Sequence, residues 1–193
     1  MKQVVVGWLV YSLTGSALLL GVVSFSREIS AFLISIFAGV FADKYNKHKL
    51  LMVCQTIIAI NATALAVFTI SGNINFTLIL SLEIIFGLVS GLEMPSRHAF
   101  VSDLVEDKAY LTNAIALNSS LFNTARIVGP ALAGILIPLI GEGYCFLLYA
   151  IASFSVVVFF AFIKYRPAPK EFPKQNFKNA FAEGARFAFK TKH

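Results

Sequence analysis

Long apolar runs separated by short polar breaks dominate the pattern along the chain. Five runs are long enough to cross a bilayer, which takes about 20 mostly apolar residues. They cover residues 16–42, 50–70, 76–94, 112–140 and 144–163. The breaks TGSA, DKYNKHK, SGNIN, SRHAFVSDLVEDKAY and GEG carry turn residues or charge. Because the apolar positions form blocks and not one stripe of helical period, the pattern predicts membrane-spanning helices.

A sixth apolar run, QVVVGWLVYSLTG, opens the chain. A helix over residues 1–14 would reach only about 20 Å at roughly 1.5 Å per residue, against a hydrocarbon thickness of about 30 Å. We interpret it as the outer part of an incomplete first span. A secretory signal peptide is the alternative, although no A-x-A-like cleavage site precedes the next run. The predicted fold is an all-α, polytopic membrane bundle of six spans over 1–165, followed by a separate segment over 166–193.

Composition and charge support the membrane prediction and add an orientation. The chain is 58% hydrophobic with a mean hydropathy of +0.77, above the ~45–50% apolar content of soluble domains. Thirteen of the sixteen lysines and arginines fall in 43–49, 95–111 and the tail from Lys164 onward. Basic residues concentrate on the cytoplasmic side. We therefore expect 43–49, 95–111 and the tail 166–193 to face the cytoplasm, in a multi-pass protein of the cell's inner (plasma) membrane.

Four ionisable residues fall within the apolar runs: Arg27, Glu28, Glu83 and Arg126. Such groups cost about 2.5–3.5 kcal/mol or more in a bilayer, so they should face the bundle interior or a water-filled cavity and pair. Helical rise places Glu28 and Arg126 near mid-depth, while Arg27 points about 100° away from Glu28. We expect a Glu28–Arg126 ion pair. A role in transport and a purely structural role in holding helices together both stay open.

The fourth run carries further candidates. Gly87 and Gly91 have the small-xxx-small spacing of a close helix contact. Glu93 and Arg97, at i and i+4, are predicted to form a charge pair at the inner end of this run.

Motifs for covalent chemistry are missing from the sequence. No G-x-x-x-x-G-K-[ST], C-x-x-C or H-E-x-x-H pattern occurs. We therefore expect no enzyme, no catalytic residues, no cofactor and no metal, and we expect no nucleic-acid partner.

The break between the second and third spans carries a family signature. Its residues resemble the loop motif G-x-x-x-D-[RK]-x-G-[RK]-[RK] of the major facilitator superfamily. The matching positions are Gly39, Asp43, Lys44, Asn46, Lys47 and His48. Asn46 stands where the motif has glycine, a mild departure because asparagine tolerates the left-handed conformation better than other non-glycine residues. The resemblance implies a gating loop; a simple positive orientation signal is the alternative.

A second resemblance lies in LNSSLFNTARIVGPALAGILI, residues 117–137. It is similar to the fifth-span motif of the superfamily's drug exporters, with Gly129, Pro130 and Gly134 at the motif positions and Ala133 replacing a glycine. On a helix Arg126, Pro130 and Gly134 share one face. PSRHAFVSDLV followed by N-A-x-A-L-N-S resembles the branch that includes enterobactin and macrolide exporters.

These resemblances imply the amino-terminal half of a twelve-span secondary transporter that works by alternating access. The expected activity is export of small amphiphilic molecules, drug- or siderophore-like. Its expected partners are the lipid bilayer, a small-molecule substrate, a coupling ion (a proton by default) and a second six-span half, in the same chain or a second subunit. Many proton-coupled exporters have arginine at the position of Glu83, so the usual coupling route is in doubt, although Glu83 could itself carry a proton. The alternative is a truncated or decayed half-transporter without activity of its own.

The last segment, 166–193, changes composition and resembles the start of the inside linker to a second half. Phe177, Phe181, Gly184 and Ala188 share one helical face, which predicts an amphipathic helix on the membrane surface. A basic disordered tail is the alternative.

Overall fold

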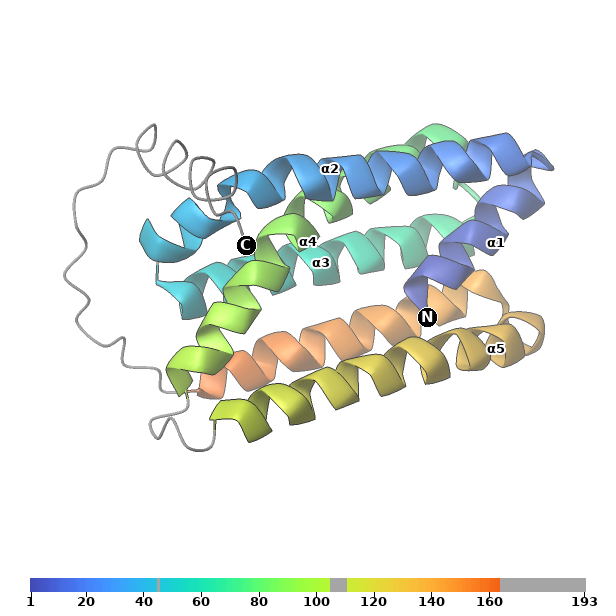
Figure 1. Cartoon of the computed structure of the whole chain (residues 1–193). Helices are drawn as coiled ribbons and strands as arrows, with labels where there is room; N and C mark the ends of the chain where they lie inside the picture. The colour runs from blue at the N-terminus through green and yellow to red at the C-terminus, as the bar shows by residue number, and fades with distance from the viewer. Residues whose placement is uncertain (45, 105–110, 164–193) are drawn as a thin grey trace, which may run out of the picture.

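The computed structural model describes residues 1–44, 46–104 and 111–163, with side chains except at 39–44, 102–104 and 111. Every element in these ranges is an α-helix: α1 (Lys2–Thr14), α2 (Ala17–Lys44), α3 (Lys47–Ile70), α4 (Phe76–Leu104) and α5 (Leu111–Phe162). They form one elongated bundle (Figure 1). Four of them, α2 to α5, are long and apolar enough to cross a membrane. The predicted all-α membrane bundle is confirmed at this level; the predicted helix in 166–193 lies outside the described residues.

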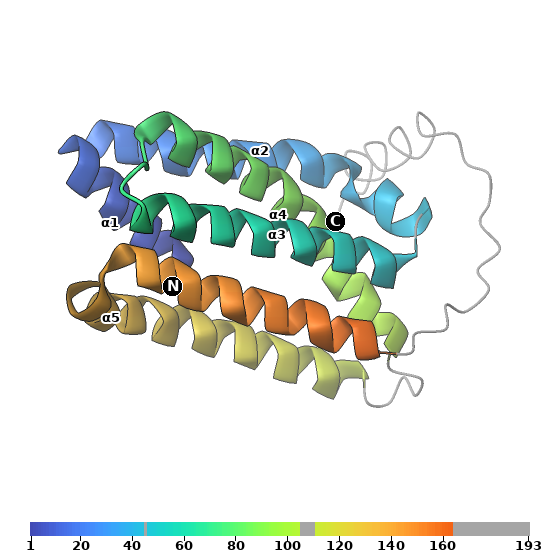
Figure 2. The same cartoon turned by 180° about the vertical axis from the view of Figure 1, so that it is seen from behind.

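Glycines in the left-handed region end two helices at the same end of the bundle. Gly15 has φ 63° and its N–H donates to the Tyr11 carbonyl at 2.8 Å, which closes α1. Gly141, with φ 81° and ψ 166°, breaks α5, in a backbone region that side-chain-bearing residues rarely adopt. The two legs of α5 consequently run side by side (Figures 1 and 2). The turn predicted at GEG is therefore present.

The end of α4 differs from the prediction. We expected a span ending at Met94 and a loop over 95–111, yet α4 continues to Leu104 with Pro95 inside it. A proline inside a helix removes the hydrogen bond of its own N–H, and its ring crowds the carbonyl four residues earlier. Here packing supports the next turn: Ser96 and Phe100 are buried, and the Ser96 hydroxyl donates to the Leu92 carbonyl at 2.7 Å. The helix therefore continues through Pro95 to the carboxyl-terminal end of α4 at Leu104.

Asn46 has a local role at the start of α3. Asn46 has φ −62° and ψ 114°, which is extended and not left-handed backbone. Its side-chain oxygen accepts a hydrogen bond from the Lys49 N–H at 3.2 Å. Asparagine is a preferred N-cap because this bond satisfies a free N–H of the first helical turn. Asn46 therefore starts α3, a task that glycine performs less well.

Small residues allow the closest helix contact in the bundle, between α2 and α4. A Cβ atom added at Gly87 would overlap the carbonyl oxygen of Arg27, and one at Gly91 would overlap the carbonyl of Ala31 and the side chain of Ile34. The contact face predicted from the Gly87–Gly91 spacing is therefore present. Around it, α3 packs mainly on α5, and α1 covers one end of the bundle, where Val5, Val10, Leu65, Ile79 and Phe146 form the main apolar core.

The connections alternate between the two ends of the bundle. The α2–α3 turn, the end of α4 and the start of α5 lie at one end, and the α1–α2 turn, the α3–α4 turn and Gly141 lie at the other (Figures 1 and 2). The described residues at the start of α3 and the end of α4, which belong to the basic segments, thus lie at the same end. Which compartment this end faces stays a prediction.

We predict that Gly87→Val destabilises the protein by roughly 1–3 kcal/mol, because overpacking a tight interface forces the helices apart. Thermal unfolding of the full-length protein in detergent measures the effect. Gly21→Ala is the matched control, since Gly21 is also inside a helix but has no atom within 4 Å of an added Cβ. Equal melting temperatures for Gly87→Val and the control would contradict the α2–α4 contact.

Candidate functional site

Four charges form a cluster where α1, α2 and α4 meet. The Lys2 Nζ lies 2.7 Å from Oε1 of Glu83, and Nη1 of Arg27 lies 3.8 Å from Oε2 of the same carboxylate. The Arg27 Nη2 lies 2.6 Å from Oε1 of Glu28. The Glu83 side chain is 1% exposed. The cluster contains two basic and two acidic side chains, so its net charge is zero. Ionisable groups inside an apolar bundle pair in this way because an unpaired charge there is costly.

Neutral groups complete the surroundings of Lys2. Its ammonium donates to the Asn61 Oδ1 at 3.4 Å, while the Asn61 Nδ2 donates to the Leu82 carbonyl at 2.8 Å. The same ammonium lies 3.3 Å from the centre of the Phe86 ring, a cation–π contact. Sequence reasoning assigned neither Lys2 nor Asn61 to the site. The available signal was the same as for Glu83: a polar residue inside an apolar run.

The predicted Glu28–Arg126 ion pair is wrong in this structure. Glu28 pairs with its neighbour Arg27 and its side chain is 68% exposed, whereas Arg27 is 10% exposed and faces α4. Arg126 lies on an exposed stretch of α5. The reason is rotational: the helix face that carries Arg27 is the one that packs against Gly87 and Glu83, and Glu28 points about 100° from it.

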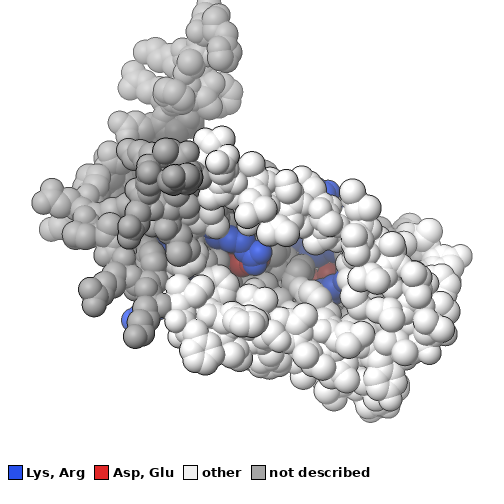
Figure 3. All heavy atoms as spheres, turned by 90° about the horizontal axis from the view of Figure 1, so that it is seen from below, with Lys and Arg blue, Asp and Glu red and all other residues white. Residues whose placement is uncertain are grey.

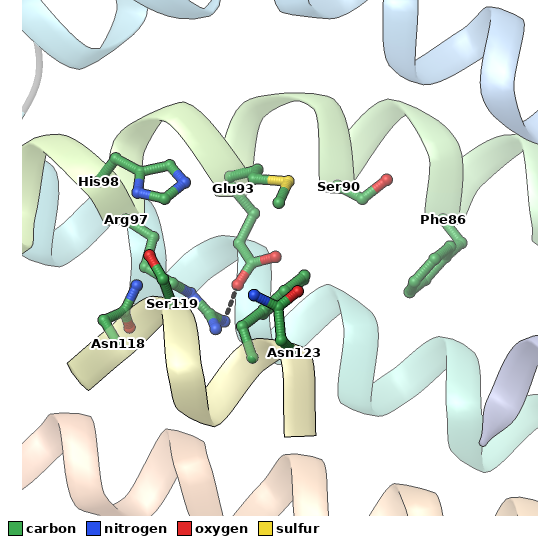
Figure 4. A pocket seen from close by; sticks show the side chains of 10 residues that line it. Phe86, Ser90, Glu93, Arg97, His98, Asn118, Ser119 and Asn123 are labelled. Carbon is green, nitrogen blue, oxygen red and sulfur yellow. Dashed lines mark hydrogen bonds and ion pairs between the residues drawn. The ribbon is translucent and has the colours of Figure 1, made fainter. Parts of the chain in front are cut away.

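A cavity of about 390 Å³ lies between α4 and the first leg of α5 (Figure 4). The ion pair that we predicted between Glu93 and Arg97 is present and lies in its wall. The Arg97 side chain is 39% exposed and that of Glu93 15%. The remaining lining residues are Phe86, Ser90, Met94, His98, Asn118, Ser119, Phe122 and Asn123. Sequence reasoning missed the contribution of α5, because no spacing rule links residues on two different helices.

A smaller cavity of about 210 Å³ lies on the other side of the same ion pair, between α3, α4 and the second leg of α5. Phe86, Glu93 and Arg97 line both cavities. Seen from below, the described surface is largely uncharged, and basic and acidic atoms gather at the bottom of a hollow (Figure 3). On this face, charged side chains therefore lie inside a recess.

The predicted gating-loop residues divide into two groups. Gly39, Asp43 and Lys44 belong to the last turns of α2, and their side chains lie outside the described part. Lys47 donates to the Ala99 carbonyl at 3.5 Å. The His48 Nε2 lies 2.8 Å from the Phe160 carbonyl, and its ring contacts Phe100 and Phe160. Lys47 and His48 thus join α3 to α4 and α5 at the basic end of the bundle.

The predicted fifth-span motif lies on the first leg of α5. Gly129 approaches α1 so closely that a Cβ would come within 2.9 Å of the Met1 nitrogen, whereas nothing lies within 4 Å of a Cβ at Gly134. Pro130 is exposed. Arg126, Pro130 and Gly134 therefore form an exposed stripe, separate from the buried charge cluster.

These features define a multi-pass membrane helix bundle with neutralised charges and a polar cavity among apolar helices. In the part of the chain that the structure describes, no three His, Cys, Asp or Glu side chains gather to hold a metal ion. The family model described as transmembrane secretion effector, from the major facilitator superfamily, matches residues 1–193. The chain therefore belongs to this family, and the resemblance drawn from its motifs is confirmed.

A named relative agrees with this assignment. The Staphyloferrin A transporter of Staphylococcus aureus (strain NCTC 8325 / PS 47) is 33% identical over 157 residues, which cover 81% of this chain. The alignment spans 39% of the relative's own length. Family and relative are transporters and not enzymes, as the sequence predicts.

We predict that Glu83→Gln and Lys2→Met each destabilise the protein by roughly 3–5 kcal/mol, because each leaves a buried charge without its partner. The double variant Lys2→Met/Glu83→Gln should recover most of the loss, since Arg27 and Glu28 still balance each other. Thermal unfolding of the full-length protein in nanodiscs measures this cycle. Glu28→Gln, at an exposed position, serves as a control. Additive losses in the double variant would show that Lys2 and Glu83 do not interact.

Proposed function

We propose that this chain forms the amino-terminal six-span half of a secondary active transporter that exports small amphiphilic molecules. A second six-span half, in the same full-length chain or in a second subunit, would complete the central pathway. The α1 segment and the two legs of α5 supply three of the six spans, and α2, α3 and α4 supply the others. The basic connections 43–49 and 95–111 and the tail 166–193 face the cytoplasm in this arrangement, and the membrane is the inner (plasma) membrane.

The observation that carries the proposal is the buried Glu83 carboxylate with its cationic partners Lys2 and Arg27, beside the exposed Glu28. Ionisable residues within membrane spans are costly and mark substrate or ion pathways. The Glu83 carboxylate has two cationic partners from two other helices. Protonation of Glu83 would remove the attraction that holds α1 and α2 to α4. Binding or release of one proton by Glu83 would thus change how the helices pack. Coupling of proton movement to transport requires such a change.

Proton coupling through Glu83 therefore differs from the route that uses an arginine in the fourth span. Here the acid lies on α4 and bases lie on α1 and α2. Because the acid in this arrangement is a carboxylate that can bind a proton, we propose the proton as the coupling ion. The name of the relative adds siderophore-like molecules to the substrate proposal.

Transport in membrane vesicles tests the proposal, with staphyloferrin A as the probe and the full-length protein in everted and right-side-out vesicles. We expect gradient-driven uptake into everted vesicles and its loss with a protonophore. The Lys2→Met/Glu83→Gln variant, which keeps the cluster neutral, should transport only down the substrate gradient. Uptake restricted to right-side-out vesicles would contradict export, and proton-driven accumulation by the double variant would contradict the role of Glu83.

A further inference from the structure

The Arg97 guanidinium offers more hydrogen-bond donors than its partner uses. Its Nη2 donates to Oε1 of Glu93. A guanidinium carries five N–H donors in a planar fork, and among the described residues Glu93 is the acceptor it contacts. Since the Arg97 side chain is 39% exposed at the wall of the 390 Å³ cavity, donors of its fork stay available to a molecule inside.

Two carboxamides add further hydrogen-bonding groups beside Arg97. Asn118 and Asn123 lie on α5 beside the Glu93–Arg97 pair (Figure 4). Each carboxamide carries two N–H donors and one acceptor oxygen. The acceptor of the ion pair, Glu93, is the less accessible member at 15% exposure and already binds Arg97. The charged group that the cavity exposes most is therefore the cation Arg97, with two carboxamides able to donate beside it, which favours an anionic oxygen ligand over a cation.

Apolar side chains form the rest of the wall. Phe86, Met94 and Phe122 line the same cavity. A volume of about 390 Å³ falls within the roughly 300–1,000 Å³ of small-molecule sites, which combine apolar walls with a few placed polar groups. The site thus offers polar groups for one part of a ligand and apolar side chains for the remainder.

We propose that this cavity binds an amphiphilic carboxylic acid. The ligand carboxylate pairs with Arg97, Asn118 and Asn123 donate to its oxygens, and its apolar part lies against Phe86, Met94 and Phe122. Glu93 is a positioning residue that holds the guanidinium toward the cavity. The inference rests on the proposed transport function and names the substrate class for it.

Binding to the full-length protein in nanodiscs tests the inference, with naphthalene-1-acetate and its uncharged isostere naphthalene-1-acetamide as probes. Isothermal titration should show that the acetate binds more tightly by roughly tenfold or more, the range expected for hydrogen bonds to a charged group. Arg97→Gln should remove this preference. Lys49→Gln, which removes an exposed positive charge at the same end of the bundle, should retain it.

The double variant Glu93→Gln/Arg97→Gln provides the same comparison if Arg97→Gln does not fold, because it leaves neither charge without a partner. Equal affinities for acetate and acetamide in the wild-type protein, or a preference that survives loss of Arg97, would overturn the inference. Arg97-dependent binding together with failed vesicle transport would reject the transport function alone. Vesicle transport without any carboxylate preference would reject the site alone.

Discussion

The ion pair between Lys2 and Glu83 is the constraint on which the packing of the bundle depends. A carboxylate that is 1% exposed among apolar helices needs compensating charge, and its partners come from elsewhere in the sequence. The helices α1, α2 and α4 must therefore pack so that Lys2, Arg27 and Glu83 lie at the same level along the bundle axis. Gly87, one turn from Glu83, contacts the Arg27 backbone, so the smallest residue and the buried charge belong to the same junction.

The first leg of α5 contrasts with this junction. Its residues 112–140 are mostly exposed, and Ala133 is its buried apolar contact with the core. Gly129 meets α1, while Arg126, Pro130 and Gly134 face away from the described bundle. The bundle thus combines a tightly fixed region around Glu83 with a leg whose packing is sparse. The 390 Å³ cavity lies between α4 and this leg, and its polar groups come from both helices.

Hydrophobic blocks, break residues and helical spacing were sufficient to predict the helices, the turn at Gly141, the Gly87–Gly91 contact and the Glu93–Arg97 pair. These features depend on residues close together in the sequence. The partner of Glu83 was missed, and Glu28 was given the inward position that Arg27 holds, because helix rotation depends on the facing helix. The extension of α4 past Pro95 was missed because burial of Ser96 and Phe100 outweighs a local break signal.

Phe86 joins the two charged sites of α4. Glu83 and Glu93 are ten residues apart, about 15 Å along the helix, and each belongs to a neutral group of charges. The Phe86 ring lies under the Lys2 ammonium and also lines both cavities beside Arg97. If Glu83 takes up a proton, Lys2 loses its anionic partner while its contact with this ring stays. Because the Phe86 ring contacts Lys2 and also lines the cavity, the proposed proton site and the proposed ligand site share this residue.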